Sequence, residues 1–156
     1  MTIKPIGVIE TNFEEKSGVP IQSVFGKEHE GVITIFPEYA DGLNDLSAIS
    51  HIYLIYHFNR HHDYSMMVTP YMDDTPRGLF ATRAPKRPSG IGMSVVEIIR
   101  VEKNKIFFKG VDMLNNTPLL DIKPYVPEID CFPMAKSGWY ENIKNKNKNK
   151  VSDDRF

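Results

Sequence analysis

The sequence predicts an all-β fold, either a barrel or a sandwich, built from many short strands. Short segments rich in β-branched and aromatic residues recur along the 156-residue chain, bounded by Gly, Pro or acidic residues. No 3.6-residue hydrophobic periodicity lasts long enough for a series of βαβ units, which argues against a doubly wound sheet. The length suits one domain with a proper core.

The first strands are predicted at residues 3–10 and 31–36, where Ile and Val recur between Gly, Pro and Glu. Residues 51–58, "HIYLIYHF", form a near-continuous apolar and aromatic run. A helix of that length is the competing interpretation, but two Ile, two Tyr and a Phe favour a strand. We expect a central strand buried on both faces. Residues 42–49 predict one or two short helical turns.

The clearest element lies at residues 93–112, "MSVVEIIRVEKNKIFFKGVD". Val95, Glu97, Ile99 and Val101 alternate with the residues between them, and the polar turn "EKNK" leads into a second apolar run at 106–111. The pattern predicts a β-hairpin.

The expected domain covers residues 1–140. Residues 141–156 form a low-complexity tail rich in Lys and Asn, with no apolar face, and we expect it to be disordered. Its alternating lysines could bind RNA, although a solvated tail is the favoured interpretation.

Composition excludes several classes of protein. The formal net charge of −1 provides no general attraction to nucleic acid, so RNA binding must depend on local patches. Cys131 is the only cysteine, which rules out an internal disulfide and a thiolate zinc site. No apolar run approaches the roughly 18 residues of a membrane span, and the N-terminus lacks the pattern of a secretory signal. We therefore expect a cytoplasmic protein with no membrane partner.

Three cations lie in the stretch 80–94, "FATRAPKRPSGIGMS", between two apolar segments. Arg83 and Arg87 carry planar forks suited to a carboxylate or phosphate, and Lys86 adds a point charge. Lys123, in "DIKPY", is a further candidate for binding an anion. A proline-rich surface turn whose cations are simply solvated is the alternative.

Asp112 lies at the expected end of a strand beside the turn "NNTP", where it could accept hydrogen bonds from hydroxyl or amine groups. Unaided, the pattern favours an Asx-type turn cap. The cluster His57, His61 and His62 raises the possibility of a metal-dependent hydrolase. The spacing is poor for a metal, because the preceding run predicts a strand and no carboxylate completes a familiar motif, so we expect no metal.

Four ordered blocks resemble the signature blocks of the TsaA-like family, whose characterised members are S-adenosylmethionine-dependent tRNA (adenine-N6) methyltransferases. They are "PIGVIET", "SHIYLIYHF", "GLFATRAPKRPSGIGMSVVEI" and "DMLNNTPLLDIKPYVP". The resemblance covers about residues 3–133.

The resemblance implies a compact antiparallel β-barrel with S-adenosyl-L-methionine as methyl donor. The implied acceptor is the exocyclic amine of a threonylcarbamoyl-modified adenosine beside the anticodon of tRNA, with no role for DNA. It also implies a homodimer whose cofactor site lies close to the subunit interface.

Carried over position by position, the resemblance implies a set of cofactor contacts, with Asp112 also a candidate proton acceptor. The contacts are Pro20, Ile21, Gln22, Phe58, Asn59, Arg83, Met93, Asp112, Met113, Leu114 and Asn115.

This sequence departs from the family pattern at three places. Ile21 stands where Arg is usual, "RPSGIG" replaces "RPNPIG", and "NNTP" replaces "DGTP". These departures keep two alternatives open. One is a non-catalytic barrel that binds an adenine nucleotide or RNA, and the other is a methyltransferase that acts on a small molecule.

Overall fold

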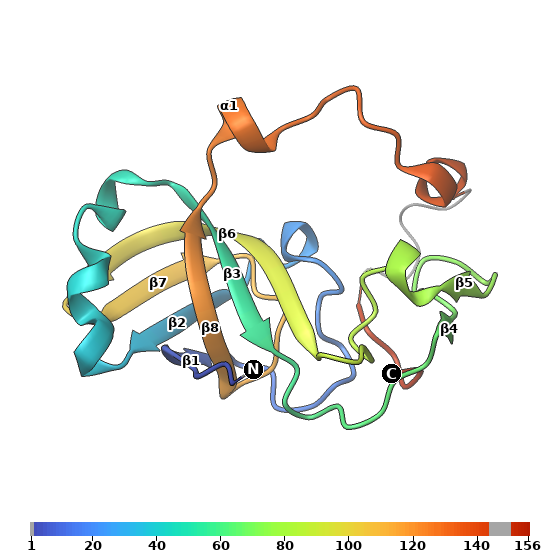
Figure 1. Ribbon diagram of the computed structural model, residues 1–156, viewed down its shortest axis with the longest axis horizontal. Coiled ribbons are helices and arrows are strands. Elements are labelled where there is room, and N and C mark those ends of the chain that lie inside the picture. Colours follow the sequence, from blue (N-terminus) through green and yellow to red (C-terminus); the bar gives the residue numbers. More distant parts are fainter. Residues whose placement is uncertain (1, 144–150) are drawn as a thin grey trace.

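The computed structural model describes residues 2–143 and 151–156, and its main element is a closed barrel (Figure 1). Neighbouring strands are antiparallel in the order β1-β2-β7-β6-β3-β8, and β8 pairs with β1 to close the barrel. The prediction of an antiparallel barrel is confirmed. The barrel strands are β1 (Gly7–Glu10), β2 (Glu30–Ile35), β3 (His51–His57), β6 (Ile91–Glu102), β7 (Lys105–Lys109) and β8 (Thr117–Pro124).

The remaining elements are short. A two-stranded pair, β4 (Met67–Val68) with β5 (Arg77–Gly78), lies beside the barrel near the C-terminus (Figure 1). The helical turns are η1 (Ser23–Phe25), η2 (Pro37–Leu43), η3 (Leu46–Ala48), η4 (Leu79–Ala81), α1 (Pro127–Asp130) and η5 (Gly138–Asn142). Within the described ranges, no helix has the length and apolarity needed to cross a membrane.

The predicted hairpin is confirmed as β6 and β7, which turn at Lys103 and Asn104. The expectation that residues 51–58 are buried on both faces is wrong. Burial alternates along β3, so that Ile52, Leu54 and Tyr56 are buried and the residues between them are only half-buried. A barrel has one interior, and each strand turns every second side chain away from it.

Large aliphatic and aromatic side chains fill the barrel interior. Ile9, Ile33, Leu54 and Phe108 are fully buried there. A Cβ at Gly31 would lie 2.6 Å from the Phe108 ring, so glycine on β2 leaves the room that this ring occupies. The core thus holds the strands that carry the site described below.

The last six residues lie against the loops beside the barrel. Val151 pairs with Pro20, and the backbone N–H of Ser152 donates to the carbonyl of Val19 at 2.7 Å. Phe156 packs on a small cluster formed by Val68, Leu79 and Ala84. Within the stretch 141–156, for which we expect disorder, residues 151–156 are thus anchored by an aromatic side chain and strand-like hydrogen bonds. The expectation for 144–150 falls outside the described residues.

Replacing Phe156 with Ala should lower the free energy of unfolding by about 1–2 kcal/mol, because the ring is only partly buried in its cluster. For a chain of this length, that loss corresponds to a melting temperature about 2–8 °C lower. Differential scanning calorimetry measures it, with Val151→Ala, an exposed position, as the control. An unchanged melting temperature for Phe156→Ala would show that the segment contributes nothing to stability.

Candidate functional site

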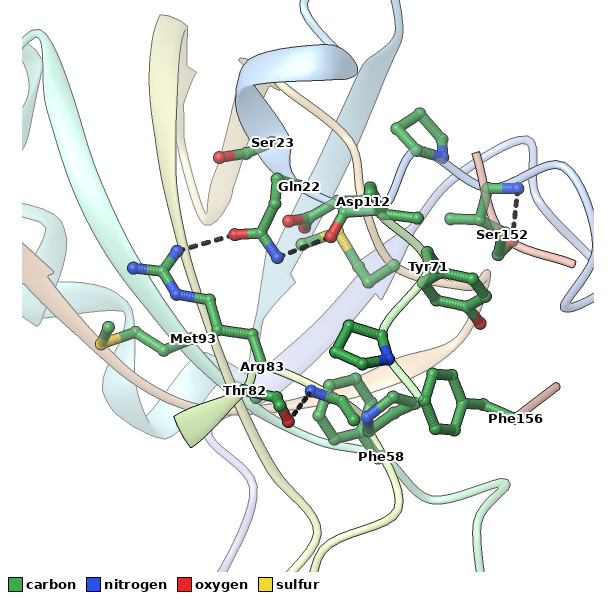
Figure 2. Close-up of a pocket in the computed structure, with 18 of the residues that line it drawn as sticks. Gln22, Ser23, Phe58, Tyr71, Thr82, Arg83, Met93, Asp112, Ser152 and Phe156 are labelled. Carbon is green, nitrogen blue, oxygen red and sulfur yellow. Dashed lines mark hydrogen bonds between the residues drawn. The ribbon is translucent and has the colours of Figure 1, made fainter. Parts of the chain in front are cut away.

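A cavity of ≈ 960 Å³ opens beside the barrel, where loops far apart in the sequence meet. Its walls come from the segment around η1, the start of β6, the loop after η4, and the residues that follow β7. Ser152 and Phe156 of the C-terminal segment contribute a further wall (Figure 2). The volume is in the range that holds small-molecule ligands and cofactors.

Asp112 lies on this wall, three residues after β7, and the residue as a whole is half-buried. Ser94 Oγ lies 2.7 Å from one carboxylate oxygen and 2.9 Å from the other. Burial raises the pKa of Asp112 from 3.8 to about 7. The hydrogen bond from Ser94, the backbone N–H of Ser23 and the charge of Arg83 oppose that rise. The group can therefore gain or lose a proton near neutral pH.

Tyr56 continues this arrangement inside the barrel. Its Oη lies 3.1 Å from Ser94 Oγ, and both residues are buried. Burial, reinforced by the negative charge of Asp112, raises the pKa of Tyr56 well above its usual value. The phenol thus stays protonated and available as a hydrogen-bond donor.

Arg83 faces the same cavity from the loop after η4 (Figure 2). Its guanidinium donates to Gln22 Oε1 at 2.7 Å, and Gln22 Nε2 donates to the carbonyl of Ile21 at 2.6 Å. Arg83 forms no ion pair within 4 Å with any carboxylate of the described residues. This guanidinium is available to an anionic ligand.

The loop that carries Arg83 is braced from within. Leu79 is buried, and Thr82 Oγ1 donates to its carbonyl at 2.8 Å. The Arg87 guanidinium donates to the carbonyls of Thr82 and Ala84, at 3.1 and 3.3 Å. Arg87 also lies 5.8 Å from the ring centroid of Phe80, which is 71% exposed. Arg87 therefore holds the loop and places a cation at the rim of the cavity.

Aromatic side chains line much of the rest of the cavity. The Tyr71 and Phe156 rings meet edge to face, with centroids 5.0 Å apart, and Phe58 contacts Tyr56 in the same way at 5.3 Å. At the rim, Trp139 Nε1 donates to the carbonyl of Ala81 at 2.7 Å. Such surfaces suit flat heterocycles, including purine bases.

The structure brings most of the expected site residues together. Those that line the cavity are Pro20, Ile21, Gln22, Phe58, Asn59, Arg83, Arg87, Met93, Asp112, Met113 and Leu114.

Asn115, Lys86 and Lys123 do not line it. The Asn115 amide braces a neighbouring loop, accepting from the Thr11 N–H at 3.0 Å and donating to Glu14 Oε1 at 2.7 Å. Lys86 and Lys123 each form an ion pair with an aspartate, at 3.2 and 2.9 Å.

Sequence reasoning missed several wall residues, among them Tyr56, Tyr71, Trp139 and Phe156. The alternation in β3 marks Tyr56 as an inward residue but cannot tell that its hydroxyl reaches a carboxylate. No local signal marks the other three. The described residues, which include His57, His61 and His62, contain no group of three His, Cys, Asp or Glu side chains that could hold a metal ion.

Comparison with known proteins gives a consistent result. The sequence model of the tRNA-methyltransferase O N-terminal domain matches residues 8–131. A probable S-adenosyl-L-methionine-binding protein of Pyrococcus abyssi is 46% identical over 153 residues, covering 98% of this chain and 83% of the relative. A tRNA (adenine(37)-N6)-methyltransferase of Rattus norvegicus is 33% identical over 134 residues, covering 81% of this chain and 31% of the relative.

Solved structures show the same fold. The crystal structure of TrmO from Pseudomonas aeruginosa superposes with a TM-score of 0.75 at 34% sequence identity. The match covers 88% of this chain and 62% of that one, so this chain spans less than two thirds of the TrmO chain.

Proposed function

Because the chain belongs to the tRNA-methyltransferase O family, as its sequence resemblance indicated, we propose that it transfers a methyl group from S-adenosyl-L-methionine to the exocyclic amine of an adenine in tRNA. The acceptor in this proposal is a threonylcarbamoyl-modified adenosine beside the anticodon. The names of the relatives support the donor and the class of acceptor.

The observation that carries the proposal is that Arg83 and Asp112 line the same cavity without forming an ion pair with each other. A guanidinium without a carboxylate partner suits the carboxylate of the cofactor's methionine part. The aromatic and aliphatic walls suit its adenine, and a volume of ≈ 960 Å³ leaves room for a second, incoming base. The residues present therefore fit S-adenosyl-L-methionine.

When bound, S-adenosyl-L-methionine supplies a methyl group on a sulfonium that is already a good leaving group, so the protein need not activate it. What remains for the chain is to align the acceptor, exclude water and remove a proton. Asp112 suits the last task, because its raised pKa makes the carboxylate a base near neutral pH. The N–H bond of the acceptor amine breaks, and its proton forms an O–H bond on the carboxylate.

The acceptor base would enter from the rim of the cavity. Enzymes that act on bases take the target out of its stack, and unpaired RNA bases bind on aromatic and Arg surfaces. Phe80 with Arg87 and Trp139 with Arg77, 5.4 Å from that ring, provide such surfaces at the rim. These surfaces are the local patches on which RNA binding would depend in a chain whose formal net charge is −1.

We also propose that the protein is a homodimer that acts in the cytoplasm. Ile129 in α1 is 67% exposed. Phe132 and Met134 are 73 and 93% exposed on the segment between α1 and η5, which arches away from the barrel (Figure 1). An apolar surface of this kind suits a protein partner. Light scattering after size exclusion measures the mass, and a value of 17.9 kDa, that of one chain, would contradict the dimer.

Two measurements test the activity. Calorimetric titration with S-adenosyl-L-methionine should show saturable binding at one site per chain. Incubation with that donor and tRNA, followed by nucleoside mass spectrometry, should show that the modified adenosine gains about 14 Da, because one methyl replaces one hydrogen. Binding without methylation of tRNA would support a binding barrel or a small-molecule acceptor instead.

A further inference from the structure

The carboxylate of Asp112 is held from inside the barrel wall. Ser94 is 4% exposed on β6, and its Oγ contacts both carboxylate oxygens, at 2.7 and 2.9 Å. A hydroxyl at this position on a barrel strand would be costly without partners, because buried polar groups must be hydrogen-bonded. Ser94 has two, since Tyr56 Oη lies 3.1 Å away on the neighbouring strand β3.

Strand register determines where Tyr56 lies. Tyr56 pairs with Gly92 and Leu54 with Ser94 across β3 and β6. A Cβ at Gly92 would overlap the Tyr56 ring, so glycine leaves the space that the ring occupies beside β6. From there the Tyr56 hydroxyl reaches Ser94, two residues further along β6. The paired strands thus place the three polar groups in a row that ends at the cavity.

The protons in this row have only one consistent arrangement while Asp112 is ionised. A carboxylate only accepts hydrogen bonds, so Ser94 must donate its single proton to Asp112. Tyr56 must then donate to Ser94. When Asp112 is protonated it can donate to Ser94, and Ser94 can donate to Tyr56. The row therefore accommodates both protonation states with its own groups.

We propose that Ser94 and Tyr56 are positioning residues that orient the Asp112 carboxylate toward the cavity and keep it ready to take a proton. This inference rests on the proposed function, in which Asp112 receives the proton of the acceptor amine. Ser94 does not line the cavity, so it acts only through the carboxylate. Tyr56 does line the cavity, and the role proposed for its hydroxyl is to act on Asp112 through Ser94.

The other groups that lower the pKa of Asp112 are the Arg83 guanidinium and the backbone N–H groups of Ser23 and of Asp112 itself. Removing the Ser94 hydroxyl leaves these three and takes away a hydrogen bond that lowers the pKa of Asp112. The pKa should then rise. Hydrogen bonds to charged groups contribute enough for a shift of about one pH unit.

The test is a carboxyl titration of the whole chain by ¹³C NMR, without cofactor or tRNA, with the Asp112 signal assigned by its absence in Asp112→Asn. In Ser94→Ala the midpoint should move up by about one pH unit. Ser94→Thr, which keeps the hydroxyl, should restore most of the wild-type midpoint, and Tyr56→Phe should shift it less than Ser94→Ala. The acid limb of the kcat profile should move in the same direction, with little change in KM.

The outcomes separate the two proposals. If the wild-type protein methylates tRNA and the Asp112 midpoint is the same in Ser94→Ala, the inference is overturned and the proposed function stands. If the midpoint moves as expected but the wild-type protein methylates no adenosine, the proposed function is overturned. The control is Ser50→Ala, an exposed serine whose hydroxyl is hydrogen-bonded to the neighbouring His51. Its titration should match the wild type.

Discussion

Replacing Asp112 with Asn should lower kcat for methyl transfer by about 10²- to 10⁴-fold, the contribution of a positioned general base. Asn keeps the shape of the side chain and an oxygen that can accept from Ser94. It cannot take the proton of the acceptor amine. The affinity for tRNA should change far less than kcat, because the lost interaction is made only during the reaction.

Single-turnover methylation of modified tRNA measures this effect, alongside calorimetric affinities for S-adenosyl-L-methionine and tRNA. The matched control is Asp121→Asn on β8, an aspartate paired with Lys123 outside the cavity. Equal losses in kcat and in binding would make Asp112 a binding residue only. An unchanged kcat would remove it from the chemistry.

The pH dependence of stability gives an independent check on the same variant. The pKa of Asp112 is about 7 in the folded protein and close to 3.8 when unfolded. Between these values the folded state holds a proton that the unfolded state has lost, so this group makes stability fall as pH rises from about 4 to about 7. The Asn amide does not titrate, so the variant escapes this loss of stability. The melting temperature of Asp112→Asn, measured relative to that of the wild type, should therefore be higher at pH 8 than at pH 4.

The sequence predicts the barrel well because its strands carry local signals. The alternation around Val95 and the polar turn at Lys103 locate the β6–β7 hairpin without any knowledge of the rest of the chain. The docking of Phe156 cannot be found in that way. Its partners Val68 and Leu79 are distant in the sequence. A single aromatic residue at the end of a polar stretch forms no hydrophobic periodicity that could predict packing.

The site shows the same division. Arg83 stands out because three cations lie in one stiff turn. Asp112 is marked only by the family resemblance, because an acid beside a turn is by itself typical of a turn cap. Ser94 carries no such mark, since a serine in an alternating strand resembles any inward residue until the register opposite Leu54 is known. Lys123 is the opposite case, because its charge is visible in the sequence while its ion pair with Asp121 on β8 is not.

Replacing Arg83 with Ala should weaken binding of S-adenosyl-L-methionine by about 10- to 100-fold, since a charge-assisted hydrogen bond contributes about 1.5–3 kcal/mol. The folded barrel should be unaffected, because the side chain is exposed and its hydrogen bond within the described residues goes to Gln22. Arg83→Lys should fall between wild type and Ala, because it keeps the charge but not the planar fork.

Calorimetric titration with S-adenosyl-L-methionine and with sinefungin-like analogues that retain the amino-acid part would measure the loss, and 5′-methylthioadenosine, which lacks the carboxylate, isolates its cause. If Arg83 holds the carboxylate, Arg83→Ala should weaken the cofactor and leave 5′-methylthioadenosine unchanged. Arg100→Ala, at a residue paired with Glu102 away from the cavity, should change neither affinity. Equal loss for both ligands would instead mean that Arg83 shapes the cavity through Gln22, and the carboxylate would need another partner.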